Sequence, residues 1–295
     1  MLEDLRSKFP LLNERLAEAS GIIDEDLVSL IELGPAERLN QTEITQPVML
    51  ATSVALFEIW RAQGGASPHA VAGHSLGEYS ALTVAGVFSF SDAIKLVHER
   101  GKLMQGAVPS GAGAMAAVLG VELEELQEFC NADDGVVAPA NINSPGQVVI
   151  SGAADAVNRV AEKVLAEGDK RKRVVPLDVS VPSHCELMAP ATQGVAQLLA
   201  ETSMNKPMCP IFQNVDAEAA DDLDGVRSRL IKQLSSPVRW ADCVTAMLAR
   251  GCDALIECGP GKVLTGLSRR IDRRMNCRAI STVGDFDDAL AAINT

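Results

Sequence analysis

Aromatic residues are scarce in this chain of 295 residues, which has seven Phe, two Trp and one Tyr. Proteins that bind single-stranded nucleic acid stack bases on such side chains, and a formal net charge of −13 opposes contact with phosphate backbones and anionic membranes. Long apolar runs are also lacking, because charged residues, Gly or Pro interrupt them. We therefore expect no membrane span, and neither nucleic acid nor membrane as a general partner.

The seven cysteines form no CxxC pair, and the first ten residues, MLEDLRSKFP, lack the apolar core of a signal peptide. An odd, scattered set predicts reduced thiols in a cytoplasmic protein rather than a disulfide framework or a zinc site. Cys252 and Cys258 are expected to be core thiols, and no metal-ligating constellation is visible.

The order of predicted elements indicates one domain inserted into another. Helices are expected first, at 11–20 and 47–63, then a short apolar strand at 69–73 and helices at 77–86 and 91–105, the last with Ser91 as N-cap. Residues 114–180 then follow the order βαββαβ, which is typical of a ferredoxin-like unit. We place this small subdomain at 112–181, and a large subdomain at 1–111 and 182–295, where helix and strand alternation returns.

Ser75 lies in GHSLG, between a predicted apolar strand and a predicted helix. G-x-S-x-G in that context is the nucleophile-elbow pattern, in which glycines permit a tight turn that exposes the hydroxyl at a helix N-terminus. The backbone N–H of Leu76 and the helix dipole could there stabilise an oxyanion. The alternative is a Gly-rich turn with a capping Ser, but the strand and helix around it favour a nucleophile.

A serine nucleophile needs a base, and the chain has only four histidines, at 69, 74, 98 and 184. His69 precedes the strand and is expected to face solvent, the side chain of His74 points away across the turn, and His98 lies on a helix. His184 follows the small subdomain in VPSHCELM, at the junction where sites tend to lie, so it is the favoured base. No His follows it, which argues against an ordinary α/β-hydrolase with a C-terminal His.

Arg100 lies on the helix whose apolar side carries Ile94, Val97 and Met104. Two interpretations stay open for it. It could be a surface residue whose stem covers apolar groups, or it could project into the cleft and bind a carboxylate through two parallel hydrogen bonds.

At these residues the chain resembles the malonyl-CoA:acyl carrier protein transacylases of bacterial fatty acid synthesis, and the likeness covers nearly all of it. The segments that carry the resemblance are TQPVMLATSVAL, GHSLGEYSAL, HERGKLMQ, GAGAMAAVLG, NINSPGQVVISG, VSVPSHCELM, QLSSPVRW and GPGKVLTGL. The resemblance implies an α/β fold, with an α/β-hydrolase-like large subdomain built on a parallel sheet and an inserted ferredoxin-like small subdomain.

The resemblance also implies roles for single residues. Ser75 would be the nucleophile and His184 the base, oriented by the backbone carbonyl of Gln233, so that a dyad replaces the triad. The Leu76 N–H would donate to the oxyanion, and Arg100 would pair with the free carboxylate of malonate. Three further positions would line or border the pocket: Met104, Asn143 and Ser183.

The implied reaction is ping-pong transfer of malonyl from malonyl-CoA to the phosphopantetheine thiol of acyl carrier protein, through a malonyl-serine and without a cofactor. A monomer is expected. Acetyl-CoA should be selected against, because it would leave a buried Arg unpaired. Two alternatives are a serine thioesterase or other hydrolase, and a non-catalytic subunit that binds carrier protein. Two questions stay open: whether malonyl or methylmalonyl is the preferred acyl group, and whether the carrier protein serves fatty acid or polyketide synthesis.

One departure from the family pattern concerns the start. The family begins with an apolar strand and a GQGSQ-like turn, whose Gln supplies the second oxyanion N–H, whereas this sequence starts in what resembles the following helix. We favour a start assigned too late over a real loss. The expectation is that the chain as written is poorly stable or poorly active.

Two basic clusters interrupt the acidic chain, at Lys170–Arg173 and at Arg269–Arg274. They are either solvated faces or docking sites for an acidic carrier protein or the CoA phosphates. Reversing the charge of the four arginines at 269, 270, 273 and 274 should then raise the KM for carrier protein.

Overall fold

The fold was analysed in a computed structural model, which describes residues 3–293. The chain alternates helices with short strands, and the predicted α/β class is confirmed. Its helices are α1 (Glu3–Lys8), α2 (Pro10–Ile23), α3 (Leu27–Leu33), α4 (Ala36–Leu39), α5 (Thr42–Ala62), α6 (Leu76–Val84), α7 (Phe90–Ala107), α8 (Leu123–Asn131), α9 (Ala154–Ala166), α10 (Ala189–Glu201), α11 (Leu223–Gln233), α12 (Trp240–Ala249), α13 (Val263–Ile271) and α14 (Val283–Ile293). Its strands are β1 (Val71–Ala72), β2 (Gly113–Leu119), β3 (Val137–Ser144), β4 (Gln147–Ala153), β5 (Arg173–Pro176), β6 (Ile211–Phe212), β7 (Ala254–Glu257) and β8 (Asn276–Ala279).

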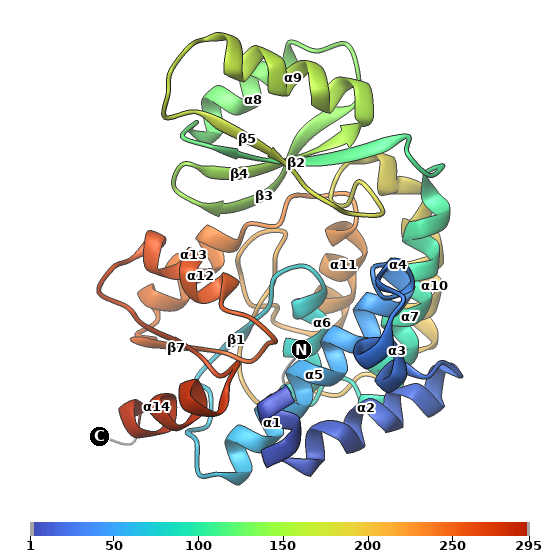
Figure 1. Cartoon of the computed structure of the whole chain (residues 1–295), viewed down its shortest axis with the longest axis vertical. Coiled ribbons are helices and arrows are strands. Elements are labelled where there is room, and N and C mark those ends of the chain that lie inside the picture. Colours follow the sequence, from blue (N-terminus) through green and yellow to red (C-terminus); the bar gives the residue numbers. More distant parts are fainter. Residues whose placement is uncertain (1–2, 294–295) are drawn as a thin grey trace.

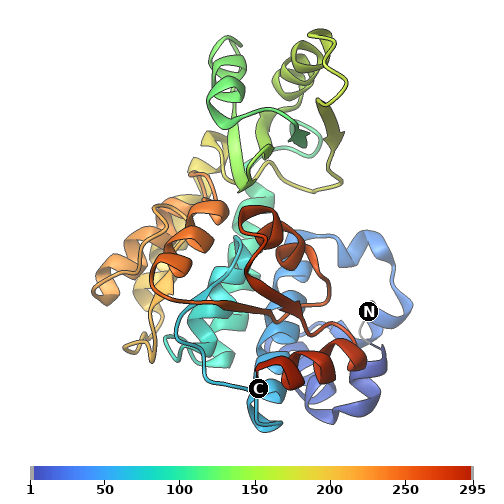
Figure 2. The ribbon, with the colours of Figure 1, turned by 90° about the vertical axis from the view of Figure 1, so that its left-hand side faces the viewer.

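Strands β2 to β5 form one antiparallel sheet in the order β3-β4-β2-β5, at one end of the molecule (Figures 1 and 2). With α8 and α9 this is the ferredoxin-like arrangement expected from the βαββαβ pattern. The apolar faces of both helices pack against one face of the sheet, around Val118, Ile150 and Val160. The exact division at residues 112 and 181 stays a prediction.

The parallel strands of the large part form two separate pairs. Strand β1 pairs with β6 and β7 pairs with β8, and within residues 3–293 neither pair joins the other. The sequence predicted one parallel sheet here, so this division is a finding of the structure. The remaining edges of β1 and β7 both line one large cavity.

Helices α5 and α7 form the centre of the large apolar core, which includes Leu50, Val54, Ile94 and Val97. They approach closely at Gly101, where a Cβ would lie 2.4 Å from the Cα of Glu43. Helix α7 begins after Ser89, whose hydroxyl accepts a hydrogen bond from the Asp92 N–H at 3.1 Å. The prediction that Ser91 caps this helix was therefore wrong, because the extended residue lies two positions earlier.

A backbone link joins the small sheet to the large part. The N–H of Ile142 on β3 donates to the carbonyl of Val238 at 2.8 Å, and the N–H of Val238 donates to the carbonyl of Ala140 at 2.8 Å. Residue 238 follows α11 closely, so the link connects the sheet to the segment that carries Gln233. None of the helices within residues 3–293 combines the length and the apolar character that crossing a bilayer requires.

Candidate active site

Ser75 occupies the turn between β1 and α6 with a strained backbone, at φ 53° and ψ −109°. Its neighbour Gly73 permits this turn, because a Cβ there would lie 1.9 Å from the backbone of Gly77. A Cβ on Gly77 would meet nothing within 4 Å, so of the two glycines only Gly73 is required by close contact. The strand-turn-helix context predicted for the motif is present, although β1 has only two residues.

The hydroxyl of Ser75 lies 2.7 Å from Nε2 of His184. Nδ1 of His184 donates to the backbone carbonyl of Gln233 at 2.8 Å, which leaves Nε2 free to accept the serine proton. A second bond, from the His184 N–H to the carbonyl of Leu234 at 3.0 Å, fixes the loop to the end of α11. The dyad and its orienting carbonyl thus come from three segments far apart in sequence.

His184 is 3% exposed, and this burial lowers its pKa to about 3, with the positive charge of Arg100 acting in the same direction. The imidazole is therefore neutral at pH 7 and available as a base. The other histidines differ. His74 contacts Asn143 through Nε2 at 2.8 Å, His98 donates to the carbonyl of Glu43 at 2.8 Å, and His69 is exposed.

Leu76 is the first residue of α6, directly after the nucleophile. The next two N–H groups donate to the carbonyls of His74 and Ser75, whereas within residues 3–293 the Leu76 N–H has no protein acceptor. A free donor at a helix N-terminus beside the serine fits the predicted oxyanion role.

Arg100 is 1% exposed, which excludes the interpretation as a surface residue. Its guanidinium donates to Oε1 of Gln46 at 2.6 Å and to Oε1 of Gln233 at 3.0 Å, and lies 5.1 Å from the ring centroid of Tyr79. Its Nε has no partner within the described residues. The close approach at Gly101 places Gln46 of α5 beside Arg100, so this contact follows from the packing of the two helices.

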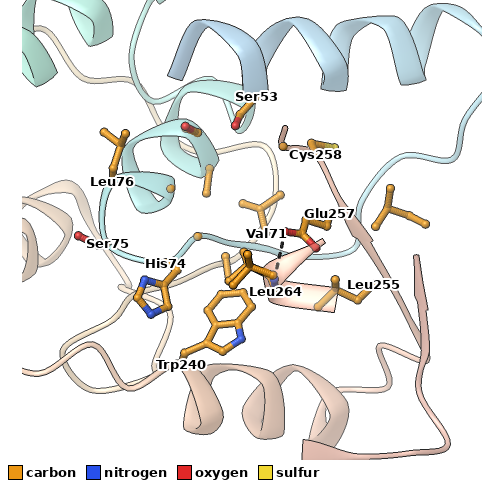
Figure 3. A pocket seen from close by; sticks show the side chains of 18 of the residues that line it. Ser53, Val71, His74, Ser75, Leu76, Trp240, Leu255, Glu257, Cys258 and Leu264 are labelled. Carbon is orange, nitrogen blue, oxygen red and sulfur yellow. Dashed lines mark hydrogen bonds between the residues drawn. The ribbon is translucent and has the colours of Figure 1, made fainter. Parts of the chain in front are cut away.

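A cavity of about 1260 Å³ passes the site. Its lining includes all the predicted pocket residues, namely Met104, Asn143 and Ser183, together with Ser75, Leu76 and Arg100. In Figure 3 the cavity extends from Ser75 past Val71 to Leu255 and Glu257 of β7. Cys252 and Cys258 also line it. Both are partly buried and pack against apolar clusters, so these predicted core thiols lie at the border of the core and the cavity.

Sequence reasoning missed a buried set of polar residues. Glu78, Gln213 and Asn214 lie beneath the turn, and Gln46 lies beside Arg100. Glu78 is visible in GHSLGEYS, since residues three apart lie on one helix face, but its partners lie more than 130 residues away. Only the fold could reveal them.

A serine–histidine pair on an α/β fold, with a free N–H donor and a buried Arg at the same cavity, defines an acyl-transfer site. Comparison with known proteins agrees: residues 10–287 match the family model described as "Acyl transferase domain". The chain is 48% identical over 283 residues to the malonyl CoA-acyl carrier protein transacylase of Escherichia coli K12, which covers 95% of this chain and 91% of that protein. The chain belongs to the malonyl CoA-acyl carrier protein transacylase family.

Solved structures give the same result. The malonyl CoA-acyl carrier protein transacylase of Coxiella burnetii superposes with a TM-score of 0.96 at 42% identity, covering 100% of this chain and 93% of that one. A malonyl-transacylase solved in complex with a type II PKS acyl-carrier protein superposes with a TM-score of 0.95 at 44% identity, covering 99% and 94%.

Proposed function

We propose that this chain transfers a malonyl group from malonyl-CoA to the phosphopantetheine thiol of an acyl carrier protein, through a malonyl ester of Ser75. The observation that carries the proposal is the 2.7 Å contact between Ser75 Oγ and His184 Nε2, at a cavity that also reaches the buried Arg100. The related complex with an acyl-carrier protein supports the choice of acceptor.

In the first half-reaction, His184 takes the Ser75 proton while Oγ attacks the thioester carbonyl carbon. The negative charge that develops on the carbonyl oxygen is stabilised by the Leu76 N–H at the start of α6. Collapse of this intermediate breaks the carbon–sulfur bond, and the CoA thiolate takes the proton from His184. Malonyl-serine remains.

In the second half-reaction, the carrier-protein thiol gives its proton to His184 and attacks the ester carbonyl. Collapse returns the proton to Ser75 Oγ and leaves malonyl on the carrier. Throughout, the Gln233 carbonyl holds the imidazole in the tautomer that accepts at Nε2.

Arg100 would bind the free carboxylate of the malonyl group. Only two of its five N–H groups have described acceptors, and its Nε has none within residues 3–293. A substrate carboxylate would satisfy donors that an acetyl group leaves unpaired, which disfavours acetyl-CoA. Met104, Asn143 and Ser183 would border the acyl group. A cytoplasmic location and a monomeric state remain predictions from the sequence.

The test is intact-protein mass spectrometry after brief incubation with malonyl-CoA. We expect one malonyl adduct on the wild type and none on Ser75→Ala. Ser53→Ala is the matched control, because Ser53 lines the same cavity but should not react. The Ser53→Ala protein should therefore still form the malonyl adduct on Ser75.

Adding carrier protein that bears phosphopantetheine should then move the adduct to the carrier. Release of free malonate instead would identify a hydrolase. Carrier binding without any adduct would contradict the catalytic role and identify a non-catalytic binding subunit.

A further inference from the structure

The carboxyl group of Glu78 lies beneath the nucleophile turn and is fully buried at 0% exposure. Its Oε1 accepts from the Gln213 side-chain amide at 3.0 Å, and its Oε2 accepts from the Asn214 N–H at 2.8 Å and from Nε2 of Gln233 at 3.0 Å. Burial raises the pKa of Glu78, whereas the three N–H donors that converge on it and the charge of Arg100 oppose that shift. A group that only receives hydrogen bonds from donors fits an ionised carboxylate, because a carboxylate only accepts. The dyad chemistry assigns no role to this group.

Two of these partners hold the turn itself. Oδ1 of Asn214 accepts from the N–H of Ser75 at 2.7 Å, and Nδ2 of Asn214 donates to the carbonyl of Gly73 at 2.7 Å. Nε2 of Gln233 also donates to the carbonyl of Ser75 at 3.1 Å. The strained conformation of Ser75 is therefore fixed on both sides by Asn214 and Gln233, which bind Glu78 through a backbone N–H and a side-chain amide respectively.

The Gln233 side chain connects two charges that do not touch. Its Oε1 accepts from Arg100 at 3.0 Å, and its Nε2 donates to Glu78 at 3.0 Å. Arg can only donate and a carboxylate can only accept, so together they determine which way this amide points. The backbone carbonyl of the same residue orients His184. Arg100, the dyad and Glu78 thus meet at one residue.

We propose that Glu78 is a positioning residue that, through the Gln233 amide, holds Arg100 in the orientation that selects acyl groups with a free carboxylate. Its negative charge also offsets the buried charge of Arg100, which a neutral surrounding would leave costly. This inference rests on the proposed function and deepens it: selection between malonyl and acetyl depends on a group that touches neither substrate.

The test variant is Glu78→Gln, which keeps the size but replaces one acceptor oxygen by an NH₂ group. The negative charge is lost, and the Gln233 amide no longer faces a group that can only accept, so its orientation is no longer imposed from that side. The measurement is the kcat/KM for acylation of Ser75 by malonyl-CoA and by acetyl-CoA, followed by intact mass. We expect the malonyl-to-acetyl ratio to fall by about tenfold or more, since a hydrogen bond to a charged group is lost.

A merely structural role would not give this result, because partial unfolding lowers acylation by both donors equally and leaves the ratio unchanged. An unchanged ratio in a folded Glu78→Gln protein would therefore overturn the proposal. If that variant does not fold, Gln233→Met carries the test: it retains the carbonyl that orients His184 but removes the side-chain link, and the same fall in the ratio is expected.

The double variant gives a second criterion. If Glu78 acts through Gln233, the two substitutions should lower the ratio together no more than either does alone, whereas additive effects would overturn the link. Wild-type protein measured in parallel separates this outcome from failure of the proposed function, because absence of any wild-type adduct would contradict the function itself.

Discussion

Ser75 and His184 both have positive φ, at 53° and 64°, in a region that residues with a side chain rarely adopt. Such positions cost about 1 to 3 kcal/mol each and persist only where the surroundings hold them. Asn214 holds the first through the Ser75 N–H, and the Leu234 carbonyl holds the second through the His184 N–H. The strain therefore contributes to a dyad that is oriented before substrate binds.

Burial of His184 makes stability depend on pH. In the unfolded chain this histidine takes up a proton near pH 6.5, whereas burial lowers its folded pKa to about 3, so stability is full above pH 6.5 and falls as the pH drops below it. The loss from His184 between pH 7 and pH 5 is about 2 kcal/mol. Urea unfolding of wild type and His184→Gln at both pH values measures it, and the variant should lose about 2 kcal/mol less.

His69→Gln, at an exposed position, is the control for loss of a histidine as such. Burial lowers the pKa of His74 as well, so some acid sensitivity should remain in the His184 variant. An identical loss in wild type and His184→Gln would contradict the prediction.

At the scale of single residues, the sequence predicted those that lie in recognisable motifs. It missed those whose role depends on contacts with residues far away in the chain. Ser75 stands in a recognisable pattern, and scarcity of His pointed to His184. Both interpretations of Arg100 had to stay open, because exposure depends on helix packing. The Gln233 side chain bonds to groups 155 and 158 residues away, a contact that no local pattern encodes.

At the scale of secondary-structure elements, the second basic cluster lies on α13 and the segment that follows it. The four arginines of this cluster differ in their contacts. Arg269 donates to the carbonyl of Cys277 on β8 at 2.7 Å, and Arg274 pairs with Asp272 at 2.9 Å, so both have structural contacts. Arg270 contacts Gln147 of the small sheet at 2.5 Å, and Arg273 is exposed. In the first cluster, Lys172 pairs with Glu125 and Glu167, and Arg171 pairs with Asp169.

Charge reversal should therefore be confined to Arg270 and Arg273. If this surface attracts an acidic carrier protein, Arg270→Glu with Arg273→Glu should raise the KM for carrier protein by roughly tenfold and leave acylation by malonyl-CoA unchanged. Steady-state kinetics at low and moderate salt measure this. Lys95→Glu, at an exposed position on α7, controls for net charge. An unchanged KM for carrier protein would exclude docking here.

Helices were easier to predict than parallel strands, for a physical reason. The amphipathic α8 and α9 and the alternation in β2 to β4 are long enough to show a period. By contrast, β1 and β6 have two residues each and pair across 71–72 and 211–212, so their pairing depends on the whole fold. The division into two parallel pairs left no trace in the sequence pattern.

At the scale of the whole molecule, the division into two parallel strand pairs leaves β1 and β7 each with a strand partner on one side only. Both strands line the same cavity. Backbone groups on an edge strand lack ladder partners and are easily opened. Amides of 71–72 and 254–257 should therefore exchange with deuterium much faster than those of 148–150 in the centre of the antiparallel sheet. Hydrogen exchange followed by mass spectrometry measures the difference, and equal protection would contradict it.

The backbone link at Val238 has a consequence for the thermodynamics of substrate binding. Two hydrogen bonds tie β3 to the segment after α11, next to the residue that orients His184. The link joins β3, which carries the cavity residue Asn143, to the segment that leads to the cavity residue Trp240. The cavity therefore has few conformations to lose when a ligand arrives. The entropy lost on association should therefore fall mainly on the flexible acyl donor and on the carrier's phosphopantetheine arm, and little on the protein itself.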